Sequence, residues 1–176
     1  MSTQHLDISK LQDYLADTIP GFSGELTAEK FVGGQSNPTF KLSAGGKDYV
    51  LRRKPPGELL KSAHAVDREF RVISALADTD VPVPKTYCLC EDESIVGSMF
   101  YVMEYLEGRV FWDPTLPEID SNDERAAIYD DMNRVLAALH NVDPDAVGLS
   151  DFGRPGNYFE RQVSRWTKQY RASETE

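Results

Sequence analysis

The chain has 176 residues, of which 40% are hydrophobic, and its formal net charge at pH 7 is −10. A chain of this length and composition can bury a core, so we expect about one domain and no wholesale disorder. The acidic charge argues against general nucleic-acid binding, because contact with phosphate backbones needs a basic face. The sequence has no run of 18 apolar residues, so we expect no membrane span and no membrane partner.

The predicted elements follow the order helix, three strands, helix, two strands, connector and two helices. Apolar residues recur at helical spacing from Ile8 to Ile19, and Pro20-Gly21 ends this first helix. The pair Gly45-Gly46 predicts a hairpin turn. We expect strands at 26–32, 37–42, 48–53, 86–91 and 98–105, and further helices at 63–76, 123–140 and 157–171.

This order predicts an α+β fold, in which a protein kinase-like small lobe precedes the first helices of a helical large lobe. The small lobe is a five-stranded antiparallel sheet plus one helix, inserted between the third and fourth strands. We divide the chain into an N-terminal helix at 1–24, a small lobe with nucleotide-binding elements at 25–107, and a hinge connector with the incomplete start of the large lobe at 108–176.

The N-terminus and the cysteines indicate a cytoplasmic protein. Residues 1–10 have neither the basic region nor the apolar region of a secretory signal. Cys88 and Cys90 are too few for a disulfide framework, and a metal site would need more ligands than their neighbourhood offers. We interpret them as small side chains on one face of a strand.

The stretch 31–53, FVGGQSNPTFKLSAGGKDYVLRR, carries the strongest chemical signal. It reads as strand, glycine turn, strand, hairpin and strand, with a cation at the end. Glycines let backbone N–H groups approach an anion because no Cβ blocks the way, and protein kinases hold the phosphates of ATP in this manner. The turn is shorter than the full G-x-G-x-x-G pattern. Its candidate residues are Gly33, Gly34, Gln35, Ser36 and Asn37.

Strand parity places Val50 and Arg52 on one face of the third strand and Arg53 on the other. Val50 suits contact with adenine, and Arg52 suits the α- and β-phosphates, which arginine can bind through two N–H groups. Glu69 in the next helix supplies a carboxylate that would orient Arg52. The alternatives are a solvated arginine at a strand end and a surface glutamate of no special role.

Residues 100–108, FYVMEYLEG, form an apolar strand that turns polar and ends at a glycine. This pattern suits a hinge whose backbone N–H and C=O groups read the edge of adenine, with Met103 limiting the pocket behind it. The alternative is an ordinary core strand followed by a loop.

The chain resembles the N-terminal half of the aminoglycoside phosphotransferase and choline kinase-like family, and especially the kinase-like domain that is found alone in bacteria or fused to some acyl-CoA dehydrogenases. The resemblance lies in seven blocks that follow one another between residues 31 and 170: GGQSNPTFKL, YVLRRKPPG, VDREFRVISAL, VPVPKTY, FYVMEYLEGRVFWDP, LAALHNVD and GRPGNYFERQVSRWTKQY.

The resemblance implies a role for each candidate residue. The glycine turn at 33–37 would cover the phosphates, Arg52 would replace the family's usual lysine, and Glu69 would be its ion-pair partner. The adenine hinge would consist of Met103, Glu104, Tyr105 and Leu106.

The resemblance also places the family's catalytic loop and its metal-binding stretch downstream of the last block. The sequence contains no His-Gly-Asp. We therefore expect ATP as the nucleotide, magnesium ligands downstream of this chain, and no catalytic or metal-binding residue within it. Asp151-Phe152-Gly153 spells a kinase magnesium motif but follows no catalytic loop, and His140 is interpreted as a helix C-terminal residue.

Two functions remain open. The first is an ATP-dependent phosphotransferase that acts on a hydroxyl of a small metabolite or aminoglycoside-like acceptor, with this chain carrying only the nucleotide-binding half and inactive alone. The second is a non-catalytic nucleotide-binding or interaction module. Apolar stripes with nothing to cover them suggest a homo-oligomer or a missing C-terminal half. Their residues are Val135, Leu139, Val163 and Trp166.

Overall fold

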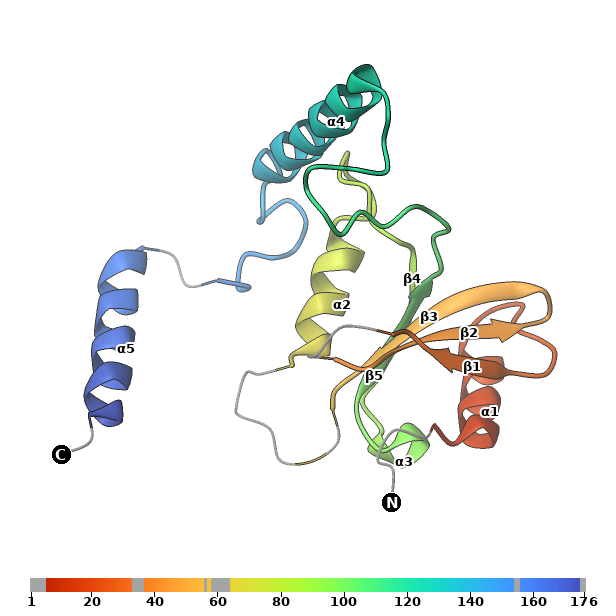
Figure 1. Ribbon diagram of the computed structural model, residues 1–176. Helices are drawn as coiled ribbons and strands as arrows, with labels where there is room; N and C mark the ends of the chain where they lie inside the picture. Colours follow the sequence, from red (N-terminus) through yellow and green to blue (C-terminus); the bar gives the residue numbers. More distant parts are fainter. Residues whose placement is uncertain (1–5, 33–36, 56, 58–63, 154–155, 175–176) are drawn as a thin grey trace. The chain divides into compact units, whose positions relative to one another are not determined.

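The structure is a computed structural model that describes residues 6–32, 37–55, 57, 64–153 and 156–174 (Figure 1). The chain forms two compact units, Met1–Val142 and Asp143–Glu176, and each is described by itself. Within the described ranges, no helix is both long and apolar enough to cross a membrane.

The first unit contains the five-stranded antiparallel sheet that the sequence predicted. Neighbouring strands follow the order β1-β2-β3-β5-β4, and every neighbouring pair is antiparallel. The fifth strand lies between the third and the fourth, so the two strands that carry the candidate residues are hydrogen-bonded to each other. The strands are β1 (Thr27–Lys30), β2 (Thr39–Ala44), β3 (Lys47–Arg53), β4 (Thr86–Cys90) and β5 (Phe100–Glu104).

One face of the sheet forms the hydrophobic core with the N-terminal helix α1 (Ile8–Thr18). Leu11 and Leu15 of this helix are fully buried in one cluster with Leu51 and Val102 of the sheet. The helix begins at Asp7, whose side chain accepts a hydrogen bond from the backbone N–H of Lys10 at 3.2 Å. A stable helix–sheet layer therefore supports the strands from this side.

The two cysteines lie in this same core. Cys88 and Cys90 of β4 are free and buried, as their spacing on one strand face predicted. Burial raises the pKa of the Cys88 thiol to about 12. A buried thiol with a raised pKa stays largely protonated near neutral pH, and Cys88 packs in the core.

A one-turn helix, α3 (Glu93–Val96), joins β4 to β5 and was not predicted from the sequence. Asp92 caps its start by accepting a hydrogen bond from the N–H of Ser94, and Gly97 ends it with a left-handed φ of 85°. A single turn is too short for a hydrophobic period, so only the capping residues could have indicated it.

The helix α2 (Val66–Ala75) packs on β4 and β5 (Figure 1). Phe70 meets the ring of Tyr101 edge to face, with 6.0 Å between centroids. The prediction started this helix at Ala63; the residue lies outside the described ranges, and the helix begins at Val66. Because Tyr101 alternates with the core residues of β5, α2 covers the sheet face opposite α1.

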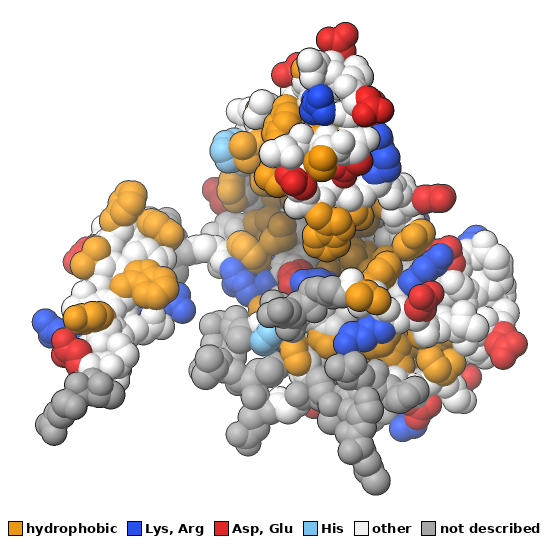
Figure 2. Space-filling view, in the orientation of Figure 1, with side chains coloured by type: hydrophobic (Ala, Val, Ile, Leu, Met, Phe, Trp, Pro, Cys, Tyr) orange, Lys and Arg blue, Asp and Glu red, His pale blue; other side chains and the backbone are white. Residues whose placement is uncertain are grey.

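The longest helices, α4 (Asn122–His140) and α5 (Tyr158–Ser173), belong to the first and second unit respectively. Both carry large exposed hydrophobic side chains, which are orange in Figure 2. Of the four side chains expected to lack cover, Leu139, Val163 and Trp166 are exposed, and Val135 is half-buried.

The β2–β3 hairpin closes through Gly45 and Gly46, which have left-handed φ values of 56° and 74°. These values suit a tight two-residue turn whose twist matches the strands. The two glycines differ in their surroundings: a Cβ on Gly45 would lie 2.4 Å from the backbone oxygen of Ser23, whereas a Cβ on Gly46 would meet nothing within 4 Å.

This difference predicts unequal costs for two neighbouring substitutions. Gly46→Ala should lower the free energy of unfolding by about 1–2 kcal/mol, the cost of a left-handed alanine. Gly45→Ala should lower it clearly further, because the new methyl group collides with backbone that cannot turn away. Urea denaturation of the two variants measures the difference, and equal losses would contradict the packing of residues 23–24 against this turn.

Candidate functional site

The candidate site lies on the α2 face of the sheet, where Arg52 of β3 meets Glu69 of α2. The Nε atom of Arg52 is 2.7 Å from Oε2 of Glu69, so the ion pair expected from the sequence is present. Both side chains are about one-third exposed, at 32% and 34%. The pair is shielded enough for direct contact and still open to solvent on one side.

Glu69 is held by more than its arginine. The hydroxyl of Tyr101 donates to Oε2 at 3.2 Å, and the amide Nδ2 of Asn37 donates to Oε1 at 3.0 Å. Tyr101 is 1% exposed, and burial beside the negative charge of Glu69 raises the pKa of its hydroxyl. The phenol therefore stays protonated and remains a donor to the carboxylate.

Arg52 is fixed on its other side by β2. One terminal nitrogen donates to the hydroxyl of Thr39 at 3.2 Å, and that hydroxyl donates to the backbone oxygen of Asn37 at 3.1 Å. Thr39 and Arg52 are also partners in the strand register. The guanidinium is thereby held at a set position beside Asn37, the last residue of the glycine turn.

The neighbouring Arg53 points to the opposite face, as strand parity predicted. It is 2% exposed, its guanidinium donates to the backbone oxygen of Val96 at 2.7 Å, and it lies over the ring of Phe40. Burial lowers its pKa from the ordinary value for arginine. Arg53 is thus a structural cation that ties β3 to α3.

The predicted hinge residues begin in β5. Met103 is the register partner of Val50, so the residue expected to limit the pocket and the residue expected to contact adenine are neighbours. The backbone N–H of Glu104 donates to the oxygen of Lys85 at 2.8 Å, and the Glu104 carboxylate accepts from the N–H of Lys85 at 3.2 Å. These bonds attach the start of the hinge to the connector before β4.

Beyond β5, the ring of Tyr105 contacts Phe31, which follows β1, and Lys41 of β2. It stacks on Phe31 with 6.5 Å between centroids and 12° between planes, and Nζ of Lys41 lies 4.5 Å from its centroid. Leu106 is exposed. The stacking of Tyr105 on Phe31 brings the hinge close to the segment just before the glycine turn.

Of the predicted glycine turn at 33–37, only Asn37 lies within the described residues. Gly33, Gly34, Gln35 and Ser36 lie outside the described residues. Three described residues of the network were missed by the sequence analysis, namely Thr39, His64 and Tyr101. Strand register brings Thr39 to Arg52 and Tyr101 to Glu69, and a loop conformation brings His64 to Asn37. No local sequence pattern encodes either arrangement.

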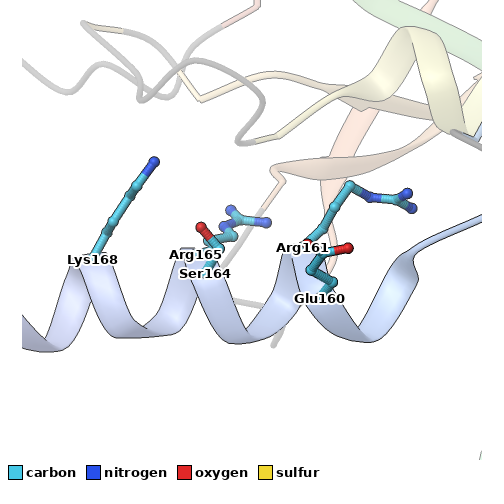
Figure 3. A pocket seen from close by; sticks show the side chains of 5 residues that line it. All are labelled: Glu160, Arg161, Ser164, Arg165 and Lys168. Atoms are coloured by element: carbon cyan, nitrogen blue, oxygen red, sulfur yellow. The ribbon is translucent and has the colours of Figure 1, made fainter.

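The second unit has an open hollow along one helix. Five side chains of α5 line it (Figure 3). Ligand sites bury most of their ligand between several elements, so a hollow along a single helix carries no functional assignment. The lining residues are Glu160, Arg161, Ser164, Arg165 and Lys168.

Comparison with known families identifies the class of protein. Residues 27–176 match the phosphotransferase enzyme family, and the chain belongs to that family. Its relatives include the probable acyl-CoA dehydrogenase IBR3 of Arabidopsis thaliana, 49% identical over 99% of this chain, and acyl-CoA dehydrogenase family member 11 of Homo sapiens, 46% identical over 97% of it. The chain spans 22% of the length of each of these relatives.

Solved structures give the same class. A putative aminoglycoside phosphotransferase from Ralstonia eutropha JMP134 is 55% identical, with a TM-score of 0.82, over 98% of this chain and 49% of its own. A thermostable mutant of aminoglycoside phosphotransferase APH(4)-Ia, in a ternary complex with AMP-PNP and hygromycin B, is 18% identical with a TM-score of 0.51, over 77% of this chain and 40% of its own. The predicted protein kinase-like fold is confirmed.

The network predicts a measurable role for the hydroxyl of Tyr101. Tyr101→Phe should lower the free energy of unfolding by about 1 kcal/mol, the usual net worth of one hydrogen bond, because a partly buried carboxylate loses one donor. Tyr105→Phe keeps the ring stacked on Phe31 and lies away from Glu69, so it should change stability less. Urea denaturation compares the two variants, and an unchanged Tyr101→Phe midpoint would contradict the role of this bond.

Proposed function

We propose that this chain is the nucleotide-binding half of an ATP-dependent phosphotransferase that acts on a hydroxyl of a small metabolite or aminoglycoside-like acceptor. The observation that carries the proposal is the Arg52–Glu69 ion pair, fixed on the sheet face beside Asn37. Family membership supports it, as do the solved complexes of APH(4)-Ia with AMP-PNP or ADP and hygromycin B.

Arg52 is the group proposed to contact the phosphates. A guanidinium has five N–H donors, and the contacts to Glu69 and Thr39 use three of them. The second N–H of each terminal nitrogen is then the donor proposed for phosphate oxygens. Glu69 keeps the guanidinium plane in place, so that binding a nucleotide does not require ordering a long side chain.

The adenine ring is proposed to lie against Val50 and Met103 and to be read by the hinge. Because the N–H of Glu104 is already bonded to Lys85, the backbone N–H offered to adenine must come from Tyr105 or Leu106. The glycine turn at 33–37 is proposed to cover the phosphates with its backbone N–H groups.

Phosphoryl transfer needs positioning and charge stabilisation more than covalent chemistry from the protein. Magnesium, where bound, neutralises charge on the transferred phosphoryl group. The described residues contain no group of three or more His, Cys, Asp or Glu able to hold a metal, and no metal-dependent step is assigned to them.

Arg52→Ala should raise the KM for ATP roughly tenfold or more while the KM for the acceptor changes little, since it removes a charge-assisted bond that only the nucleotide makes. The measurement is steady-state kinetics on the protein at its natural length, with Lys47→Ala, a cation at the exposed start of β3, as control. Equal effects on both KM values would count against the assignment.

The 176-residue chain by itself is expected to transfer no phosphate. By the family resemblance, the groups that orient the acceptor hydroxyl are proposed to lie outside this chain. A coupled ADP-release assay with purified chain, alongside the protein at natural length, measures this. Acceptor-dependent ATP turnover by the 176-residue chain alone would refute the proposal that the catalytic groups lie outside it. Nucleotide binding without turnover in the protein at natural length would favour a non-catalytic module.

A further inference from the structure

The hydrogen-bond network around Glu69 continues to a histidine that none of the predicted roles includes. Nδ1 of His64 lies 2.8 Å from Oδ1 of Asn37, whose Nδ2 lies 3.0 Å from Oε1 of Glu69. His64 comes just before α2, and its backbone oxygen accepts from the N–H of Val66 at 2.9 Å. The series His64, Asn37, Glu69, Arg52 thus joins three separate segments of the chain.

The chemistry of the partners fixes the direction of each bond. A carboxylate only accepts hydrogen bonds, so the NH₂ group of Asn37 must face Glu69 and its oxygen must face His64. Nδ1 of His64 therefore carries a proton and donates. Both the neutral tautomer with this proton and the imidazolium satisfy the arrangement.

The Asn37 side chain is well placed to join His64 to Glu69 and poorly placed for contact with a nucleotide. It is 6% exposed, and both ends of its amide are engaged. A buried amide with two set partners resists reorientation, because turning it would leave a polar atom without a bond. Any contact of Asn37 with phosphate would have to come from its backbone.

We propose that His64 and Asn37 are positioning residues that hold Glu69, and through it Arg52, in the arrangement that binds the nucleotide. This inference rests on the proposed function. The bonds of His64 and Asn37 tie the start of α2 and the last residue of the glycine turn to the same carboxylate, so the cation is set before the nucleotide arrives. Loss of either side chain should weaken nucleotide binding without removing any group that touches it.

The backbone at position 64 allows a well-matched set of variants. His64 has a φ of 59°, a left-handed conformation that asparagine, aspartate and glycine tolerate best. His64→Asn places an N–H donor where Nδ1 now lies. His64→Asp has the same size without a donor, and His64→Gly has neither donor nor added charge.

The test measures the Kd of AMP-PNP with magnesium by calorimetry on the protein at natural length. His64→Asp and His64→Gly should weaken binding about three- to tenfold, the equivalent of one hydrogen bond, and His64→Asn should stay within about twofold of the parent. Ser43→Ala, which removes a hydroxyl bonded to Asp48 on the exposed hairpin, is the control and should have no effect.

A second set of measurements removes the hydrogen bond from Asn37 to Glu69 by replacing the amide of Asn37. Asn37→Asp sets a carboxylate against Glu69 and should weaken AMP-PNP binding roughly tenfold or more through like-charge repulsion. In all variants, hydrogen exchange of the α2 amides is measured without nucleotide. Exchange should rise in His64→Asp, His64→Gly and Asn37→Asp, and stay at the parent level in His64→Asn.

The outcomes separate the inference from the proposed function. If the parent protein binds AMP-PNP and all three His64 variants bind it equally, the positioning role is wrong. If the parent does not bind AMP-PNP, the proposed function fails, and hydrogen exchange still decides whether His64 and Asn37 hold α2. Equal hydrogen exchange of the α2 amides in His64→Asn and His64→Gly would show that the bond from His64 does not hold α2.

Discussion

The arrangement of the sheet face that α2 covers depends on one partly buried carboxylate, that of Glu69. A charged group that leaves bulk water must recover its hydration from protein donors, and Glu69 recovers it from Arg52, Tyr101 and Asn37. Each donor comes from a different element, so satisfying one carboxylate sets the positions of β3, β5 and the segment before β2 relative to α2. The ion pair is therefore a structural joint as well as a candidate binding group.

The adjacent arginines show how strand geometry divides two identical side chains between two tasks. Arg53 lies on the core face, where it anchors α3 and packs on Phe40. Arg52 lies on the α2 face, held by Glu69 and Thr39 and open to solvent. The core between α1 and the sheet does not include Arg52, so a change at Arg52 should leave that core in place while it removes the cation from Glu69.

The parts of the site that follow from short-range rules could be predicted from the sequence. Alternation along β3 separates Arg52 from Arg53, and the helix after a cationic strand offers Glu69 as its partner. The rest depends on long-range geometry. Tyr101 reaches Glu69 because β5 pairs with β3 in a register that sets it opposite Arg52, and His64 reaches Asn37 through a left-handed backbone. No local period encodes either arrangement, and α3 is too short to have one.

Under the proposed function, the network would also explain how an arginine can serve where the family resemblance leads one to expect lysine. An ammonium group has three N–H donors, and bonds to Glu69 and Thr39 would leave one for a ligand. The guanidinium contacts both partners through three of its five donors, which would leave two for the phosphate oxygens of the proposed nucleotide. The two remaining N–H donors can point toward a ligand only if the guanidinium plane is fixed, because arginine is a long side chain with considerable rotamer freedom. A carboxylate that is itself held by Asn37 and Tyr101 supplies that constraint, so the arginine and the donors around Glu69 form one functional unit.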